Sequence, residues 1–258
     1  MEASNMMTPR FGIDVGNSTT KLLRLPKGPP PENRTEFSKW ASHCELRRGS
    51  FEEILNWIPK SAFVDLVSVD PIRSGELQRQ LEDQGTVVWS WTSSNLPIAN
   101  TYADDTTLGP DRPLAAYAAF AELRSAAVVV DAGTALTVDL VDDDGVFLGG
   151  AIAPGMQTIA CALGDAGAML HDTPARNLDF PGESTTDCLA LGSFATFAGA
   201  LQELVHRAKR KIPSAKVVVT GGDAKVVMEV LKENGPIERS LIPMALALLS
   251  WSHEENDD

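Results

Sequence analysis

The chain has 258 residues, of which 43% are hydrophobic and 22% charged, proportions typical of a globular protein with one large core or two smaller ones. Its formal net charge of −13 argues against nucleic acid as a partner, because nucleic-acid phosphates require basic surfaces. No apolar run approaches the roughly 20 residues that cross a bilayer, and no secretory signal begins the chain, so we expect no membrane association and a cytoplasmic location.

Two short stretches, 117 residues apart, have nearly the same pattern. In 11–23, and again in 128–140, an apolar strand ends in aspartate, a small turn with glycine follows, and a second alternating strand begins. The pattern predicts two β-hairpins, each with a carboxylate and backbone N–H groups at its tip. Because each half of the chain carries one copy, the sequence indicates an internal duplication into two similar α/β domains, 1–112 and 113–258.

Strands and helices alternate between the two hairpins. A proline-rich loop at 26–33 precedes elements that we expect to be helical at 51–58 and 75–84 and extended at 63–69 and 86–91. A helix at 114–123 then follows Asp111-Arg112-Pro113, with proline at a first-turn position. We expect this helix to bridge the two domains.

The second half continues the same alternation. We expect a turn at 142–145 and then a strand at 146–148, helices within 185–209, a strand at 216–220, and closing helices at 224–233 and 242–251. The three cysteines and four histidines lack the spacing of a disulfide framework or of a zinc site. We therefore expect reduced thiols.

The first hairpin carries the residue types of a phosphate-binding loop. Glycine lets backbone N–H groups approach a phosphate, Asn17 and Ser18 add donors, and Lys21 supplies a positive charge. Asp14 is placed to hold Mg²⁺ through water beside those phosphates. A tight turn also favours glycine and asparagine for conformational reasons alone, so the duplication is what favours the functional interpretation.

Two further glycine turns extend this pattern. The second hairpin, Asp131–Ala135, has the hydroxyl of Thr134 where the first has an amide. The turn Thr220–Asp223 joins an apolar strand to a helix, where backbone N–H groups can receive a polar or anionic ligand. With the two hairpins, this turn predicts a nucleotide site built from two phosphate loops and an adenosine loop.

Two motifs lie outside these turns. In Gly109-Pro110-Asp111-Arg112, the aspartate either caps the following helix or orients a hydroxyl for phosphoryl transfer, and the arginine suits a substrate carboxylate. The glycine-rich segment 149–155 either packs closely against neighbouring backbone or lines a substrate pocket.

Taken in order, the motifs resemble those of the type III pantothenate kinases: D-V-G-N-S-x-x-K at 14–21, G-P-D-R at 109–112, D-A-G-T-A at 131–135, G-G-A-I-A-P-G at 149–155 and T-G-G-D-A at 220–224. The resemblance implies two tandem ribonuclease-H-like domains with ATP bound in the cleft between them. It also implies transfer of the γ-phosphate to the terminal hydroxyl of pantothenate, giving 4′-phosphopantothenate for coenzyme A biosynthesis, by a homodimer. The segments 26–33 and 166–171 depart from the family pattern.

The resemblance implies individual residue roles as well. Asp111 would accept the proton, Asp131 would hold the K⁺ or NH₄⁺ ion that these enzymes require, and Asp14 would hold Mg²⁺ through water. Contacts with ATP would come from Asp14, Val15, Gly16, Asn17, Ser18, Thr19, Thr20, Lys21, Thr134, Gly221 and Gly222. Contacts with pantothenate would come from Tyr102, Gly109, Pro110, Asp111, Arg112 and, reaching across the dimer, Thr185.

Two alternatives remain open. One is a non-catalytic nucleotide-binding regulator of the Bvg accessory factor type, which shares these motifs. The other is a kinase of a different small alcohol, because fold and phosphate loops do not determine the acceptor. The presence together of Asp14, Asp111, Arg112 and Asp131 favours an active kinase.

Overall fold

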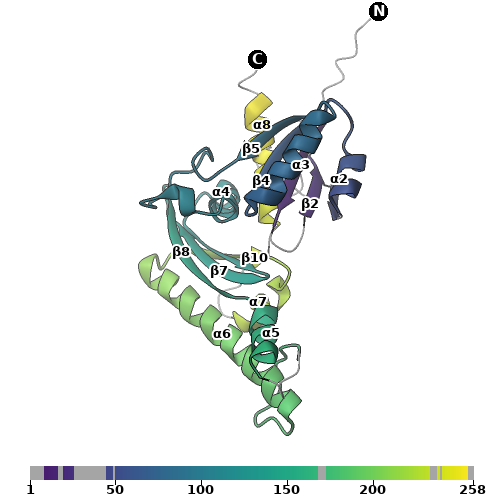
Figure 1. The fold of residues 1–258 in the computed structure, drawn as a ribbon. Coiled ribbons are helices and arrows are strands. Elements are labelled where there is room, and N and C mark those ends of the chain that lie inside the picture. Colours follow the sequence, from purple (N-terminus) through teal and green to yellow (C-terminus); the bar gives the residue numbers. More distant parts are fainter. Residues whose placement is uncertain are drawn as a thin grey trace, which may run out of the picture. The chain divides into compact units, whose positions relative to one another are not determined.

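The computed structural model describes residues 9–16, 20–25, 45–48, 50–167, 173–232, 237–238 and 240–254, and divides the chain into two compact units (Figure 1). Unit 1 comprises Met1–Ile98, Ala103–Ala118 and Leu241–Asp258, and unit 2 comprises Ala99–Tyr102 and Ala119–Ser240. The loop expected at 26–33 and most of the unusual segment 166–171 lie outside the described residues.

Unit 1 is built on a five-stranded sheet with the order β3-β2-β1-β4-β5. The first three strands pair antiparallel, and β4 and β5 pair parallel with their neighbours on the other side of β1. The strands are β1 (Arg10–Val15), β2 (Thr20–Arg24), β3 (Glu45–Arg48), β4 (Phe63–Ser68) and β5 (Val87–Trp91). The connecting helices are α2 (Phe51–Trp57) and α3 (Pro71–Asp83).

Unit 2 repeats this topology strand for strand. Its sheet has the order β8-β7-β6-β9-β10, with the first hairpin strands antiparallel and the last two strands parallel to β6. The strands are β6 (Ala127–Ala132), β7 (Ala135–Val141), β8 (Phe147–Pro154), β9 (Lys216–Thr220) and β10 (Ile237–Glu238). The helices are α5 (Met156–Ala166), α6 (Thr185–Lys211) and α7 (Ala224–Val230). The predicted α/β fold of two similar halves is confirmed.

The sheet of unit 1 buries both faces. Alternate β1 residues, beginning with Phe11 and Ile13, join a core that includes Ile54 of α2 and Leu77 of α3. On the opposite face, Gly12 lets helix α8 (Leu241–Glu254) approach, since a Cβ there would lie 3.0 Å from Leu246 Cδ1. Helix α8 therefore packs with unit 1, although the sequence placed it at the end of the second domain.

Helix α4 (Asp111–Leu123) is one continuous helix that both units share. Its residues 111–118 count with unit 1 and its last turn with unit 2. Most of its alanines are buried, and their small side chains permit close packing. The predicted bridging helix is thus present, and it begins at the aspartate of the G-P-D-R motif.

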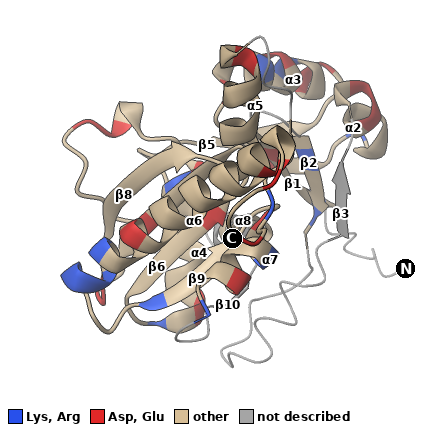
Figure 2. Cartoon of the chain, turned by 90° about the horizontal axis from the view of Figure 1, so that it is seen from below, with Lys and Arg blue, Asp and Glu red and all other residues tan. Residues whose placement is uncertain are grey.

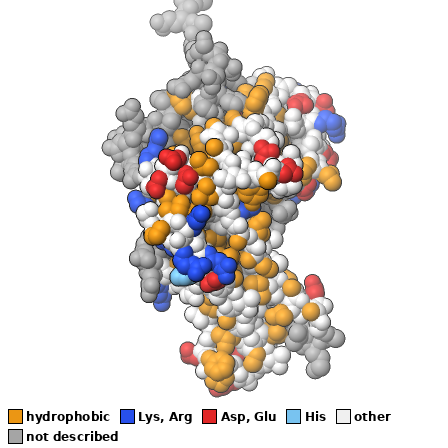
Figure 3. Space-filling model, turned by 90° about the vertical axis from the view of Figure 1, so that its left-hand side faces the viewer, with side chains coloured by type: hydrophobic (Ala, Val, Ile, Leu, Met, Phe, Trp, Pro, Cys, Tyr) orange, Lys and Arg blue, Asp and Glu red, His pale blue; other side chains and the backbone are white. Residues whose placement is uncertain are grey.

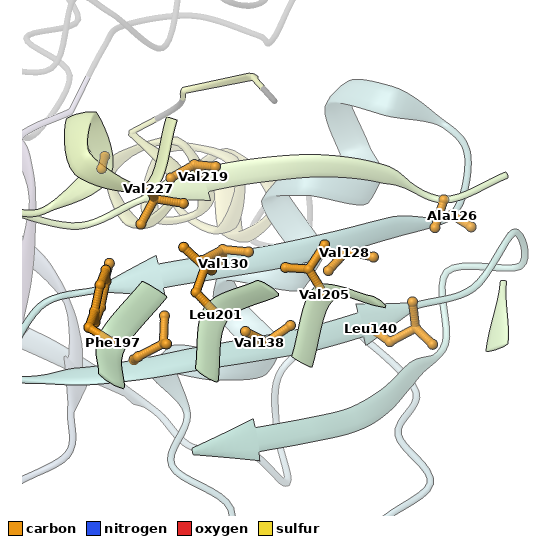
Figure 4. Close-up of a cluster of buried hydrophobic side chains, with 14 residues drawn as sticks. Ala126, Val128, Val130, Val138, Leu140, Phe197, Leu201, Val205, Val219 and Val227 are labelled. Carbon is orange, nitrogen blue, oxygen red and sulfur yellow. The ribbon is translucent and has the colours of Figure 1, made fainter. Parts of the chain in front are cut away.

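Helix α6 supplies one side of the core of unit 2 (Figure 4). Its Phe197, Leu201 and Val205 lie against valines of the sheet, among them Val130 and Val138. An 18-residue window of α6 has a mean hydropathy of 1.4, so by length and composition this helix could cross a membrane. A helix that contributes such side chains to a buried core is typical of a globular domain, although only 28% of that window is buried.

Two helices begin differently from the expectation. Helix α3 starts at Pro71 rather than near residue 75, because the Asp70 side chain accepts a hydrogen bond from the Arg73 N–H at 3.1 Å and proline fits the first turn. Helix α5 was not predicted, and its N-cap residue, Gly155, offers no side-chain capping bond.

Replacing Leu201 by alanine tests the core of unit 2. The side chain is fully buried, so Leu201→Ala should lower the free energy of unfolding by about 2–5 kcal/mol through lost burial and the cavity left behind. Urea unfolding followed by circular dichroism measures this change. The neighbouring exposed residue gives the control, since Gln202→Ala should change the same quantity by less than about 0.5 kcal/mol.

Candidate functional site

The first hairpin places a carboxylate and a lysine side by side at the end of β1. Asp14 and Lys21 face each other across the antiparallel ladder, and Lys21 Nζ lies 2.7 Å from Asp14 Oδ2. Asp14 is largely buried and Lys21 is partly exposed. The turn residues Asn17, Ser18 and Thr19, predicted to bind ATP, lie outside the described residues.

Arg73, which sequence reasoning did not single out, holds both ends of that turn. From the first turn of α3, its guanidinium donates to the carbonyl oxygen of Gly16 at 3.3 Å and to Thr20 Oγ1 at 3.4 Å. The same guanidinium lies over the ring of Phe51, 5.2 Å from its centroid, which supports the side chain from α2. Arg73 therefore positions the predicted phosphate loop.

The G-P-D-R motif lies on the same side of unit 1 as the end of β1. The Val69 N–H donates to the carbonyl oxygen of Val15 at 3.1 Å, and a Cβ on Gly109 would lie 3.6 Å from Val69 Cγ1. That Cβ would also come within 2.8 Å of Asp111 Oδ1, so glycine leaves room for the carboxylate. Unit 1 thus brings the first hairpin and this motif to either side of Val69.

Asp111 occupies the first turn of α4, and its Oδ1 accepts the backbone N–H of Arg112 at 3.0 Å. The side chain is partly exposed, whereas Arg112 is 8% exposed and so essentially buried. The bond joins the carboxylate to the next residue of the same helix and so fixes its position at the helix start.

The second hairpin is packed against Gly221. Asp131 is the penultimate residue of β6, and its cross-strand neighbour is Thr137 where the first hairpin has a lysine. A Cβ on Gly221 would lie 2.5 Å from Asp131 Oδ1 and 2.2 Å from the carbonyl oxygen of Ala132. These two oxygens therefore approach Gly221 so closely that no side chain fits at this position.

A backbone hydrogen bond holds the turn after β9 against this hairpin. Gly221 has φ +97°, a conformation that favours glycine, and the N–H of Asp223 donates to the Ala132 carbonyl oxygen at 3.0 Å. Gly222 is exposed, with open space around it. The structure thus brings Gly221 and Gly222, predicted to bind adenosine, next to the predicted cation ligand Asp131.

The start of α5 closes the tip of the second hairpin. The carbonyl oxygen of Thr134 accepts the Gly155 N–H at 3.0 Å and the hydroxyl of Thr158 at 2.6 Å. A Cβ on Gly155 would overlap the Gly133 carbonyl oxygen, so the final glycine of the 149–155 segment is needed for close backbone approach. The close-packing interpretation of this segment holds at Gly155.

Tyr102 belongs to unit 2 and covers the start of the same segment. Its ring stacks on Phe147 with centroids 6.0 Å apart, and a Cβ on Gly149 would lie 3.0 Å from the ring. The other predicted pantothenate residues, Gly109–Arg112, lie in unit 1. Thr185 is exposed at the start of α6, after the N-cap residue Ser184.

Within the described part of the chain, no group of three or more histidine, cysteine, aspartate or glutamate side chains could hold a metal ion. A Mg²⁺ ion that takes phosphate oxygens and waters as ligands needs only one carboxylate, and Asp14 fits this requirement. Away from these turns, Figure 2 shows the basic last turn of α6, Lys209–Lys211, in blue.

Comparison with known proteins gives consistent similarities. A family model described as type III pantothenate kinase matches residues 10–207, and so ends before the Gly221 turn. The type III pantothenate kinase of Hahella chejuensis is 34% identical over 169 residues, or 65% of this chain and 69% of the relative. That of Marinobacter nauticus is 31% identical over 183 residues, or 68% and 75%.

A solved structure resembles the whole fold. It is a protein of Campylobacter jejuni described as a Baf family transcriptional activator, with a TM-score of 0.61 and 20% sequence identity. The alignment covers 96% of this chain and 98% of that one. At this identity, the likeness concerns the fold alone.

The two glycines of the β9–α7 turn allow a matched test of the site's architecture. Gly221→Ala should lower the free energy of unfolding by about 1–3 kcal/mol, because alanine is strained at positive φ and its Cβ would overlap the Ala132 carbonyl oxygen. Gly222→Ala meets open space and should leave stability unchanged or slightly raised. Urea unfolding of both variants measures the difference, and equal effects would contradict the tight turn.

Proposed function

Because the chain belongs to the type III pantothenate kinase family, we propose that it transfers the γ-phosphate of ATP to the terminal hydroxyl of pantothenate. The product is 4′-phosphopantothenate, at the first step of coenzyme A biosynthesis. The observation that carries this proposal is the placement of Asp111 and the Asp14 hairpin on either side of Val69. A proton acceptor and a phosphate loop are thereby presented on one side of unit 1.

The first hairpin binds the phosphates of ATP in this proposal. Lys21 contributes positive charge, and Arg73 keeps the turn in place from its two ends. Asp14 would hold Mg²⁺ through water, and the ion would supply positive charge beside the phosphate oxygens. Thr134, Gly221 and Gly222 of unit 2 are further nucleotide contacts, and the binding of ATP in a cleft between the domains stays a prediction.

Asp111 orients the attacking hydroxyl and accepts its proton. Phosphoryl transfer passes through a loose transition state, so a carboxylate that positions the hydroxyl suffices. The hydrogen bond from the Arg112 N–H holds the carboxylate at the helix start. Tyr102, Gly109, Pro110, Arg112 and Thr185 are the proposed contacts with pantothenate.

Replacing the carboxylate of Asp111 by an amide tests this role. With ATP, Mg²⁺, K⁺ and pantothenate, the native chain should form phosphopantothenate, and Asp111→Asn should lower kcat by about 10²- to 10⁴-fold while ATP affinity is kept. Asp83→Asn, which removes the same charge from an exposed position on α3, should retain native turnover. A coupled assay of ADP release, with calorimetry for ATP binding, gives both quantities.

The outcomes separate the alternatives. Near-native turnover of Asp111→Asn would show that another group accepts the proton. A native chain that binds ATP and phosphorylates no alcohol would be a regulator of the Bvg accessory factor type. Strong turnover on a different small alcohol would show that this alcohol, and not pantothenate, is the acceptor.

The second hairpin is proposed to hold the activating K⁺ or NH₄⁺ ion. Asp131 Oδ1 and the Ala132 carbonyl oxygen both lie beside Gly221, and oxygen atoms are the ligands such cations prefer. The cross-strand neighbour Thr137 adds no charge there, whereas the carboxylate of Asp14 in the first hairpin is paired with Lys21. The two hairpins therefore differ in the charge opposite the aspartate, as this proposal requires.

Monovalent-cation dependence should follow Asp131. Replacing K⁺ by Na⁺ should lower activity of the native chain, and Asp131→Asn should raise the K⁺ concentration for half-maximal activity by at least about 10-fold. Steady-state rates over a K⁺ titration at constant ionic strength measure both effects. As a control, Asp144→Asn removes a charge from an exposed turn of the same unit and should leave the K⁺ titration unchanged. A native K⁺ response in Asp131→Asn would show that Asp131 does not hold the ion.

A homodimer is part of the same proposal. Helix α6 carries the exposed small residues Gly192, Ala195 and Gly199 on one face, and most of its apolar window is not buried within the chain. Figure 3 shows this side of unit 2 mostly as hydrophobic and uncharged surface. A second copy packed on α6 would cover that surface and bring Thr185 to its partner's substrate.

The substrates are metabolites of the cell interior, and we propose a cytoplasmic location.

A further inference from the structure

The positive charge of Lys21 is already balanced at the first hairpin. Its Nζ lies 2.7 Å from Asp14 Oδ2, so this ion pair adds no net charge beside the predicted phosphate loop. The whole chain carries a formal net charge of −13, and its field opposes the approach of an anionic nucleotide. A cation that no carboxylate neutralises would therefore act strongly on phosphates bound at this turn.

Arg73 is such a cation. Its guanidinium donates to two uncharged groups, the Gly16 carbonyl oxygen at 3.3 Å and the Thr20 hydroxyl at 3.4 Å. Among the residues that the structure describes, no carboxylate forms an ion pair with it. A guanidinium stays protonated at any ordinary pH, so its full positive charge remains beside both ends of the turn.

The surroundings of Arg73 hold that charge in one place. The guanidinium lies over the ring of Phe51, 5.2 Å from its centroid, and the side chain is only partly exposed. A side chain that is held on a ring and by two hydrogen bonds loses little further freedom when a ligand arrives. Partial burial also reduces the screening of its charge by salt.

The second unit shows that the fold itself does not require an arginine at this position. Arg73 is the third residue after Asp70, the N-cap of α3. The third residue after Asp223, the N-cap of α7, is Val226, which packs against the core of unit 2. The tip of the second hairpin is held instead by uncharged groups, among them the Gly155 N–H. The charge at the hairpin turn is therefore particular to unit 1.

We propose that Arg73 is a positioning residue that selects nucleotides by the number of their phosphates, an inference that rests on the proposed function. Its charge attracts the phosphate chain, while its two hydrogen bonds hold the turn that receives the chain. Coulomb attraction grows with the charge of the ligand, so Arg73 should favour ATP over ADP and ADP over AMP. A residue that only stabilised the fold would affect all three nucleotides alike.

Removing the charge of Arg73 tests this inference. In calorimetry with Mg²⁺ present, Arg73→Gln should weaken ATP binding by about 10-fold and AMP binding by less than about 2-fold. The ATP affinity of this variant should also fall less steeply with ionic strength than that of the native chain, because one attractive charge is absent. Arg73→Lys keeps the charge without the planar fork of donors, and should lose no more than about 3-fold in ATP affinity.

Arg79→Gln is the matched control, because it removes the same charge from an exposed position of the same helix, where Arg79 pairs with Asp83 at 3.5 Å. It should keep the native affinity for all three nucleotides. Equal weakening of ATP and AMP in Arg73→Gln would overturn the inference, as would native ATP affinity in that variant. Should Arg73→Gln not fold, a loss of about 10-fold in the ATP affinity of Arg73→Lys would overturn it. A native chain that binds no ATP at all would refute the proposed function itself.

Discussion

In each unit, the carbonyl oxygen at the end of the central strand accepts a backbone hydrogen bond from the turn that follows the next parallel strand. Val15 accepts from Val69 in unit 1, and Ala132 accepts from Asp223 in unit 2. This bond brings two turns together at the carboxyl edge of the sheet, where ligands bind in open α/β sheets. In unit 1 it also places Val69 against Gly109, so the position of the G-P-D-R motif depends on it.

The two copies keep this backbone arrangement and change the charges around it. The carboxylate of the first copy has a lysine across the ladder, and that of the second has a threonine and a closely packed glycine turn. The backbone hydrogen bonds are the same in both units, although the side chains beside them differ. In our proposal, one sheet topology presents an anion-binding loop and a cation-binding loop in the same chain.

Local patterns predicted much of this structure, and distant contacts account for what they did not predict. Both hairpins followed from alternation and turn residues within a dozen positions. Arg73 could not be found this way, since its bond to Gly16 spans 57 residues. The all-apolar pattern of α8 predicts burial without saying which sheet covers it, and α5 lacks a capping side chain at its start.

The chain leaves unit 1 at Ala118 and returns to it at Leu241, so almost all of unit 2 is an insertion within unit 1. Helix α8 follows every described strand of unit 2 in the chain, yet it packs on β1, the strand that carries Asp14. During synthesis, unit 2 has all its strands before the sheet of unit 1 can be covered on both faces. Unit 1, which holds both Asp14 and Asp111, is thus completed after unit 2. A chain that ended before α8 would lack the helix that packs on β1.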